Sequence, residues 1–184
     1  MDGFSIVYGQ FDGLKKLQGV RRVISFGGWG FSNAPSTYGV FRRIVHSQGS
    51  RGVAAKNIVQ FVVDNGLDGV TDIPGTPAGD PVTEGSNYLE FLKTVRSLLP
   101  KEKTLSIAAP ASYWYLQHFP IKDMATVVDY IIYMTYDLHG QWDYGNQYST
   151  RCLRSHVNLT ETMTALGLIT KAGVSADKVI VGGE

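Results

Sequence analysis

The stretch Asn65–Gly75, NGLDGVTDIPG, decides the fold that the sequence predicts. Gly66 ends a run with helical spacing of apolar residues, and the short apolar segment Leu67–Val70 follows at once. A helix that ends in glycine and passes directly into an apolar strand is typical of chains in which helices and strands alternate. We therefore expect a strand here that carries Asp68 toward the edge of a sheet.

Similar apolar runs, bounded by glycine or proline, predict further strands near residues 22, 104, 128 and 178. Apolar residues at helical spacing predict helices over 53–65, 87–99 and 158–171. The run 127–136 is apolar at nearly every position, as a strand covered on both faces should be. Alternating strands and helices indicate a parallel sheet, but periodicity does not choose between an open doubly wound sheet and a closed (β/α)8 barrel.

Three other segments carry weaker patterns. Residues 4–8 are apolar enough for a short strand. The segment 71–85 contains three prolines and three glycines, so it is expected to be a loop, with Ser86 as the cap of the next helix. The segment 137–156 is expected to be a polar, aromatic loop.

Composition places the chain among ordinary globular domains. The 184 residues are 43% hydrophobic and 18% charged, with a formal net charge of +1, which predicts one domain over 1–184. Charges of both signs are interspersed, so neither nucleic acid nor an anionic membrane surface is an expected partner. No run of about 18 apolar residues predicts a membrane span, and Met1–Phe4 lacks the basic start of a signal peptide.

No metal or cofactor site is predicted. Cys152 is the only cysteine, so the chain forms no internal disulfide and a thiolate metal site is excluded. The four histidines lack the spacing of a zinc-binding helix, and Gly27-Gly28 belongs to no phosphate-binding motif. Asn158-Leu159-Thr160 is a glycosylation sequon, although Asn158 is equally suited to cap the last helix.

Two glycines and a set of aromatic and polar residues follow the ends of the predicted strands: Gly27, Gly28, Trp29, Tyr113, Trp114, Tyr115, Tyr136, Asp137, His139, Gln141 and Trp142. The C-terminal ends of parallel strands meet at one edge, so these residues are expected to share a site. Aromatic faces stack on the apolar faces of pyranose rings, while carboxylates and amides bind hydroxyls. The pattern indicates a carbohydrate cleft, with core packing as the alternative for any single aromatic.

Four motifs together resemble glycoside hydrolase family 18, and most closely the fungal chitinases of the killer-toxin-subunit type. These motifs are Ser25-Phe26-Gly27-Gly28-Trp29, Leu67-Asp68-Gly69-Val70, Ser106–Tyr115, and Met134-Thr135-Tyr136-Asp137 with its continuation to Asp143. The resemblance runs from about Val20 to Val181. It implies a TIM-type barrel rather than an open sheet, chitin or chito-oligosaccharides as the substrate, and an extracellular setting.

The resemblance also implies roles for single residues. In this family a glutamic acid protonates the glycosidic oxygen while the acetamido oxygen of the substrate attacks the anomeric carbon. Asp68 matches the first acidic position of the strand that bears the acid, and Tyr136 and Asp137 match the pair that holds the acetamido group. These three are the predicted catalytic residues, and the predicted substrate-binding residues are Ser25, Gly27, Gly28, Trp29, Tyr113, Met134, Gln141 and Trp142.

The family's acidic strand, Asp-x-x-Asp-x-Asp-x-Glu, is incomplete in this chain. With Asp68 in first place, the other acidic positions fall on neutral residues, namely Thr71, Ile73 and Gly75. Asp72 is out of register by one residue, which would turn it to the opposite face. The residues after Val70 resemble the loop that normally follows this strand, so the sequence predicts a deletion that removed the acid.

The barrel is also expected to be partial. A complete one needs about 250 residues, so the resemblance implies a first strand or two before Met1, a last strand after Glu184 and a truncated fourth strand. Glu84 lies in the predicted loop and Glu90 on a predicted helix, and neither is an expected replacement for an acid borne on a strand.

Three functions remain open. The chain could be a chitin-hydrolysing domain, a non-catalytic domain that binds oligomers of N-acetylglucosamine, or a fragment without a stable function. Because the essential proton donor is missing, we expect this chain to be inactive on chitin.

Overall fold

The structure is a computed structural model that describes residues 3–73, 81–145 and 154–183. It is built around one sheet of five parallel strands in the order β1-β2-β3-β4-β5. The bounds are β1 (Val23–Gly27), β2 (Gly69–Ile73), β3 (Thr104–Pro110), β4 (Tyr130–Met134) and β5 (Val179–Gly182). These strands confirm the five that the sequence predicts.

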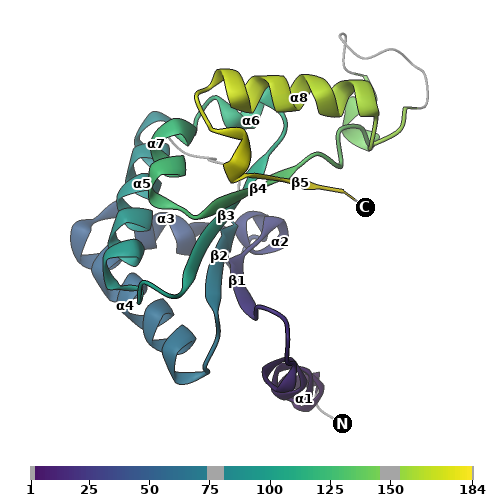
Figure 1. The fold of residues 1–184 in the computed structure, drawn as a ribbon. Coiled ribbons are helices and arrows are strands. Elements are labelled where there is room, and N and C mark those ends of the chain that lie inside the picture. The colour runs from purple at the N-terminus through teal and green to yellow at the C-terminus, as the bar shows by residue number, and fades with distance from the viewer. Residues whose placement is uncertain (1–2, 74–80, 146–153, 184) are drawn as a thin grey trace.

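The order of the strands separates the two architectures that periodicity leaves open. Each strand lies beside the next one along the chain, whereas a doubly wound sheet reverses its direction at a switch point. Helices α3, α4, α5 and α7 all lie on one side of the sheet in Figure 1. Sequential parallel order with helices on one side is the arrangement of a (β/α) barrel wall.

The helices begin and end where the sequence supplies caps. Ser47 caps α4 by accepting a hydrogen bond from the Ser50 N–H. Gly66 follows α4 at φ 61°, which glycine adopts without strain, and the Asn158 side chain accepts the Glu161 N–H at the start of α8, as predicted. The bounds are α1 (Gly3–Lys16), α2 (Trp29–Asn33), α3 (Tyr38–His46), α4 (Gln48–Asp64), α5 (Pro81–Leu98), α6 (Tyr113–Leu116), α7 (Ile121–Val127), α8 (Leu159–Lys171) and the 3-10 turns η1 (Gln141–Asp143) and η2 (Ala176–Lys178).

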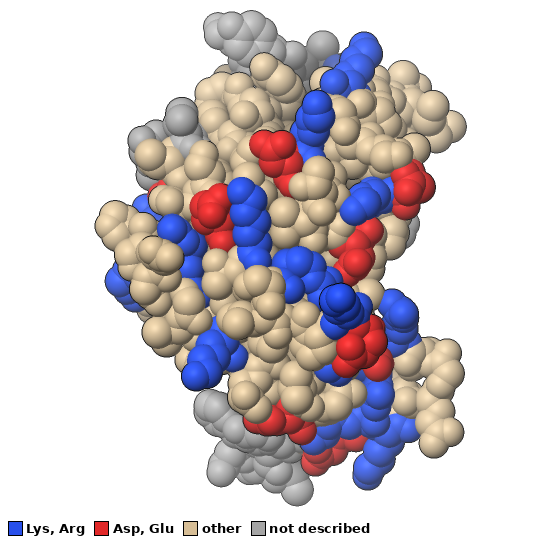
Figure 2. All heavy atoms as spheres, turned by 60° about the vertical axis from the view of Figure 1, so that its left-hand side comes forward, with Lys and Arg blue, Asp and Glu red and all other residues tan. Residues whose placement is uncertain are grey.

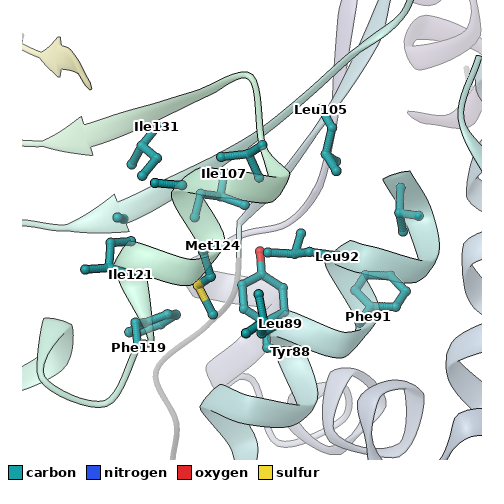
Figure 3. Close-up of a cluster of buried hydrophobic side chains, with 14 of the residues drawn as sticks. Tyr88, Leu89, Phe91, Leu92, Leu105, Ile107, Phe119, Ile121, Met124 and Ile131 are labelled. Atoms are coloured by element: carbon teal, nitrogen blue, oxygen red, sulfur yellow. The ribbon is translucent and has the colours of Figure 1, made fainter. Parts of the chain in front are cut away.

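The core lies between the sheet and its helices. β3 is buried from Thr104 through Ala109, in keeping with a central strand of a parallel sheet. Figure 3 shows the side chains of α5 and α7 meeting those of β3 and β4, with the Tyr88 ring edge-on to the Phe119 ring at 6.3 Å between centroids. The labelled residues of this buried hydrophobic cluster are Tyr88, Leu89, Phe91, Leu92, Leu105, Ile107, Phe119, Ile121, Met124 and Ile131. Burying this apolar surface is the main stabilising contribution to the fold.

Several sequence predictions about local structure are wrong. Residues 4–8 lie in α1 rather than in a strand, because a short apolar run fits both periods and only its surroundings decide between them. The predicted loop 71–85 is shorter at both ends, since β2 continues through Ile73 and α5 begins at Pro81. Proline suits the first helical position, where no N–H is needed, so Ser86 lies inside α5 and does not cap it.

The strand predicted over 127–136 is too long. Helix α7 occupies its first residue, and β4 begins at Tyr130. β4 ends at Met134 because the Thr135 N–H turns back to the Tyr133 carbonyl oxygen, 2.9 Å away, and leaves the ladder. β2 was expected to stop after Val70, yet it has five residues, as many as β1 and β4.

Charges of both signs share the surface over the helices. Figure 2 shows Lys and Arg interspersed with Asp and Glu on this face. Pairs such as Arg42–Glu84 (3.4 Å) and Lys93–Glu90 (2.7 Å) join them, and such surface pairs contribute little to stability. Within the described ranges no helix is both long and apolar enough to cross a membrane.

Gly69 is the position at which a small substitution should most disturb the sheet. A Cβ there would stand 2.6 Å from the Thr104 carbonyl oxygen, which the pairing of β2 with β3 holds in place. We expect Gly69→Ala to lower the free energy of unfolding by about 1–3 kcal/mol in urea denaturation. The matched control Gly167→Ala, in α8 with nothing within 4 Å of its Cβ, should be stabilising by about 0.5–1 kcal/mol. Equal effects would contradict the steric argument.

Candidate functional site

The end of β1 begins the candidate site. Gly27 and Gly28 have φ values of 94° and 103°, a region that favours glycine, and they turn the chain directly into α2. Trp29, the first residue of α2, is 63% exposed. Its ring meets the Tyr115 ring edge to face, with centroids 6.2 Å apart, so the ends of β1 and β3 are brought together. Ser25, two residues before Gly27 in β1, is exposed.

The segment after β3 adds more exposed aromatic surface. In α6, Tyr113 is 63% exposed and Trp114 is 69% exposed. Gln117 fixes the turn by donating a hydrogen bond from its side chain to the Trp114 carbonyl oxygen at 3.0 Å. Large aromatic faces left open at the C-terminal edge of a parallel sheet suit stacking against the apolar face of a sugar ring.

Polar groups follow β4. Met134 pairs with Pro110 and Gly182 in the neighbouring strands, and Thr135 donates from its hydroxyl to the Gly182 carbonyl oxygen at 2.6 Å. Tyr136 is half-buried. Asp137 has φ 52°, which is uncommon for a residue other than glycine, and its side chain is 66% exposed. The carboxylate is thus held by a special backbone conformation and open to a ligand.

The 3-10 turn η1 lies just beyond Asp137. Gln141 is exposed at its start. The backbone of Trp142 belongs to η1, while its side chain falls outside the described residues. His139 precedes the turn and contacts Asp143 and Glu161, so the turn is tied to α8.

A hydroxyl pair occupies the centre of the sheet. Thr71 in β2 pairs in register with Ser25 in β1 and Ser106 in β3. The Thr71 and Ser106 hydroxyls are buried and lie 2.6 Å apart. Thr71 stands at a position that the family resemblance reserves for an acidic residue. Two neutral hydroxyls cannot supply a proton at neutral pH as a carboxylic acid with a raised pKa does.

Asp68 lies at the other end of the strands. It directly precedes β2, and its Oδ2 accepts the Arg22 backbone N–H at 2.7 Å and the Arg22 Nε–H at 3.1 Å. The structure therefore leaves Asp68 at the N-terminal edge of the sheet and Ser25 in the middle of β1. The other predicted residues that it describes lie at the C-terminal side: Gly27, Gly28, Trp29, Tyr113, Met134, Tyr136, Asp137 and Gln141. A catalytic role for Asp68 stays a prediction from the resemblance alone.

Two further carboxylates considered from the sequence, Asp72 and Glu84, lie on β2 and α5. The backbone of Asp72 pairs with Phe26 and Ile107, and its side chain lies outside the described residues. Glu84 lies in the first turn of α5 beside Arg42 rather than in a loop. Gly75 and Cys152 fall outside the described residues. Among those that are described, no three His, Cys, Asp or Glu residues group as metal ligands.

Sequence reasoning missed two long-range contacts. The Thr71–Ser106 pair spans 35 residues, and the contact of His139 with Glu161 spans 22. Both depend on the register of the sheet and on where α8 packs, so no local pattern reveals them. Strand alternation applied to β2 and β3 together would have given Thr71 and Ser106 the same face.

Residues 5–183 match the model of Glycosyl hydrolases family 18. The match covers nearly the whole chain, and the chain therefore belongs to glycosyl hydrolase family 18. The resemblance that the motifs indicate is confirmed.

Two relatives fit the fungal type that the sequence suggests. Secreted chitinase LysM12 of Penicillium expansum is 52% identical over an alignment that covers 94% of this chain and 12% of the relative. Killer toxin subunits alpha/beta of Kluyveromyces lactis is 44% identical, with 91% of this chain and 15% of the relative covered. The chain thus spans only a small part of the length of these relatives.

Solved structures share the fold. Catalytic domain 2 of the Group II chitinase of Ostrinia furnacalis superposes with a TM-score of 0.79 at 22% identity, covering 98% of this chain and 50% of that chain. Chitinase ChiA74 from Bacillus thuringiensis gives a TM-score of 0.73 at 27% identity, with 94% and 30% covered. The α/β fold of family 18 barrel domains is therefore matched over most of this chain.

The Asp68–Arg22 contact predicts a pH dependence of stability. The hydrogen bond from the Arg22 backbone, with the guanidinium adding to it, holds the pKa of Asp68 below its ordinary value of 3.8. The resulting stabilisation is present above pH 3.8 and is lost as the pH falls through the lowered pKa of the folded state. We expect Asp68→Asn to lower the melting temperature at neutral pH and to match the wild type in strong acid. A difference that stays constant with pH would contradict this.

Proposed function

We propose that this chain is part of a chitinase-type barrel domain that binds chito-oligosaccharides at the C-terminal edge of its sheet without cleaving them. One observation carries the proposal: Thr71, at the second acidic position of the family's strand, is neutral and hydrogen-bonded to Ser106, and the position of the proton-donating glutamic acid falls on Gly75. Exposed aromatic and polar residues at the C-terminal edge support sugar binding, whereas the motif position of the proton donor that the family's reaction requires holds Gly75.

The binding part of the proposal is supported by the exposed aromatic residues. Trp29, Tyr113 and Trp114 leave 63%, 63% and 69% of their surface open at one edge. The exposed carboxylate of Asp137 and the amide of Gln141 follow β4 at the same edge. Aromatic faces with a few polar groups are what an oligosaccharide needs, because its rings present apolar faces and its rims present hydroxyls.

The inactive part is supported by where the described carboxylates stand. Asp68 is engaged by Arg22 at the N-terminal edge, and Glu84 is engaged by Arg42 on α5. Removal of a general acid typically costs about 10²–10⁴-fold in rate. Asp137 alone can position an acetamido group, but positioning does not replace protonation of the leaving oxygen.

A deletion after Val70 fits the comparison with a relative. The alignment with LysM12 of Penicillium expansum runs over 188 positions, although this chain has 184 residues and only 94% of it is covered. That relative therefore carries residues inside the aligned span that this chain lacks. A missing segment that includes the acidic strand end would account for them.

The proposed barrel needs more strands than the five described here. We infer that the first one or two strands and the last one belong to chain outside residues 1–184, in keeping with the coverage of only 50% of the Ostrinia furnacalis domain. They would pair with the outer sides of β1 and β5, which form the edges of the described sheet. An extracellular setting is part of the proposal, supported by the name of the secreted relative.

Binding can be tested on the aromatic edge. Chitotetraose titrated into the purified chain in a calorimeter should bind, and Trp29→Ala should weaken the affinity by about tenfold, ~1.4 kcal/mol. Tyr38→Ala is the matched control, because Tyr38 is 51% exposed but lies on α3 against Arg42. The control should bind as the wild type does. No heat of binding at millimolar ligand in any variant would favour a fragment without a sugar-binding function.

Hydrolysis can be tested with the same ligand. The purified chain should release no product from chitotetraose above a control without protein, because the proton donor is missing. A mock purification excludes contaminating enzymes. Turnover that is present in the wild type, absent from the mock and lost in Asp137→Ala would show that the site is active and that the proposed inactivity is wrong.

A further inference from the structure

His139 joins two segments that are far apart in the sequence. Its ring nitrogens lie 3.0 Å from the Asp143 Oδ2 in η1 and 2.8 Å from the Glu161 Oε2 in α8. The side chain is only 15% exposed. The same Asp143 oxygen accepts the Gly140 N–H at 3.1 Å. Through His139, the segment that carries Asp137 and Gln141 is therefore fixed to the last helix.

Both contacts can be hydrogen bonds at once only when His139 is an imidazolium. A carboxylate only accepts hydrogen bonds, and a neutral imidazole has one N–H and one bare nitrogen. Neutral His139 would thus turn a lone pair toward a carboxylate oxygen. Consistent with this geometry, the hydrogen bond to Glu161 raises the pKa of His139 above its ordinary value of 6.5, and Asp143 adds to the effect while burial opposes it.

Other charged groups face the same network. Arg154 Nη1 lies 3.5 Å from the Glu161 Oε1 and forms a second cationic contact to the same carboxylate. His156 lies on the segment before α8, where its Nδ1 is 3.4 Å from the Asp137 N–H and 3.8 Å from the Asp137 Oδ1. Its carbonyl oxygen also accepts the Leu138 N–H at 3.1 Å. Deprotonating His139 therefore removes one of several ties and loosens the segment rather than unfolding it.

We propose that His139 is a positioning residue whose imidazolium clamps the segment 137–143 onto α8, so that sugar affinity at this edge depends on pH. This inference rests on the proposed function, because it concerns the regulation of the same site. The clamp is complete below the ordinary histidine pKa of 6.5 and is lost as the pH rises through the raised pKa of the folded state. Chito-oligosaccharide binding should therefore weaken toward alkaline pH.

Protonation of His139 can be observed without any sugar. The chain labelled with ¹⁵N-histidine would be examined by two-bond ¹H–¹⁵N correlation, with the His139 signals assigned by their loss in His139→Gln. We expect both ring nitrogens to be mostly protonated at about pH 6.5, where free histidine is half neutral. A neutral tautomer of His139 at that pH overturns the clamp.

The effect on binding requires a comparison across pH. Chitotetraose affinity of the wild type, measured by calorimetry, should fall by about tenfold between about pH 6 and about pH 9, ~1.4 kcal/mol. His139→Gln should bind weakly at both pH values, with less than about a twofold change between them. The control is His46→Gln, at the exposed end of α3. This variant should keep the wild-type pH profile, because His46 takes no part in the contacts of His139.

The two measurements separate the clamp from the proposed function. A wild type that binds equally at both pH values, or a His139→Gln variant with the wild-type profile, overturns the clamp while leaving sugar binding intact. A wild type that binds at neither pH overturns the proposed function and, with it, the coupling of His139 to sugar affinity.

Discussion

The parallel register of β2 between β1 and β3 is the constraint on which the rest of the structure depends. It sets Thr71 beside Ser25 and Ser106, and it sets Val70 against Ile24 and Leu105. A shift by one residue would exchange the two faces and bury hydroxyls under the helices. The apolar helix layer forbids that exchange, because unpaired buried hydroxyls cost about 1–3 kcal/mol each. The residues presented to the site are therefore decided by packing on the opposite face.

The two edges of the sheet carry different kinds of interaction. At the N-terminal edge, the Asp68 carboxylate accepts hydrogen bonds from Arg22, and this charged pair joins the residues that precede β2 and β1. At the C-terminal edge, Trp29 and Asp137 remain exposed. β1 ends at the positive-φ pair Gly27-Gly28, and the left-handed Asp137 follows β4. If sugar binds at the C-terminal edge as proposed, stability and binding are separated in space, as is usual for (β/α) barrels. Such separation would let residues at the C-terminal edge change without loss of the fold.

The sequence predicts the repeating part of the fold because its signals are local. Gly66 and Asn158 mark helix ends, and apolar runs mark strands, each within a few residues. Where the prediction fails, distant contacts decide: the composition of 71–85 is that of a loop, yet pairing with Gly27 extends β2 to Ile73. The bridge from His139 to Glu161 has no local signal at all, because it exists only once α8 has packed beside the end of β4. The motifs predict the aromatic residues at the C-terminal edge, whereas the Thr71–Ser106 pair follows only from the register of β2 and β3.

The length of β2 also explains how the fold could tolerate the proposed deletion. The neighbours β1 and β3 offer rows of N–H and C=O groups that must be satisfied, and any extended segment can satisfy them. The residues after Val70 resemble a loop, yet they pair through Ile73 with Gly27. On the proposed deletion, loop residues have been drawn into the sheet in place of the acidic strand end. Backbone pairing does not depend on side-chain identity, so the proposed deletion could remove the acidic group and leave the sheet intact.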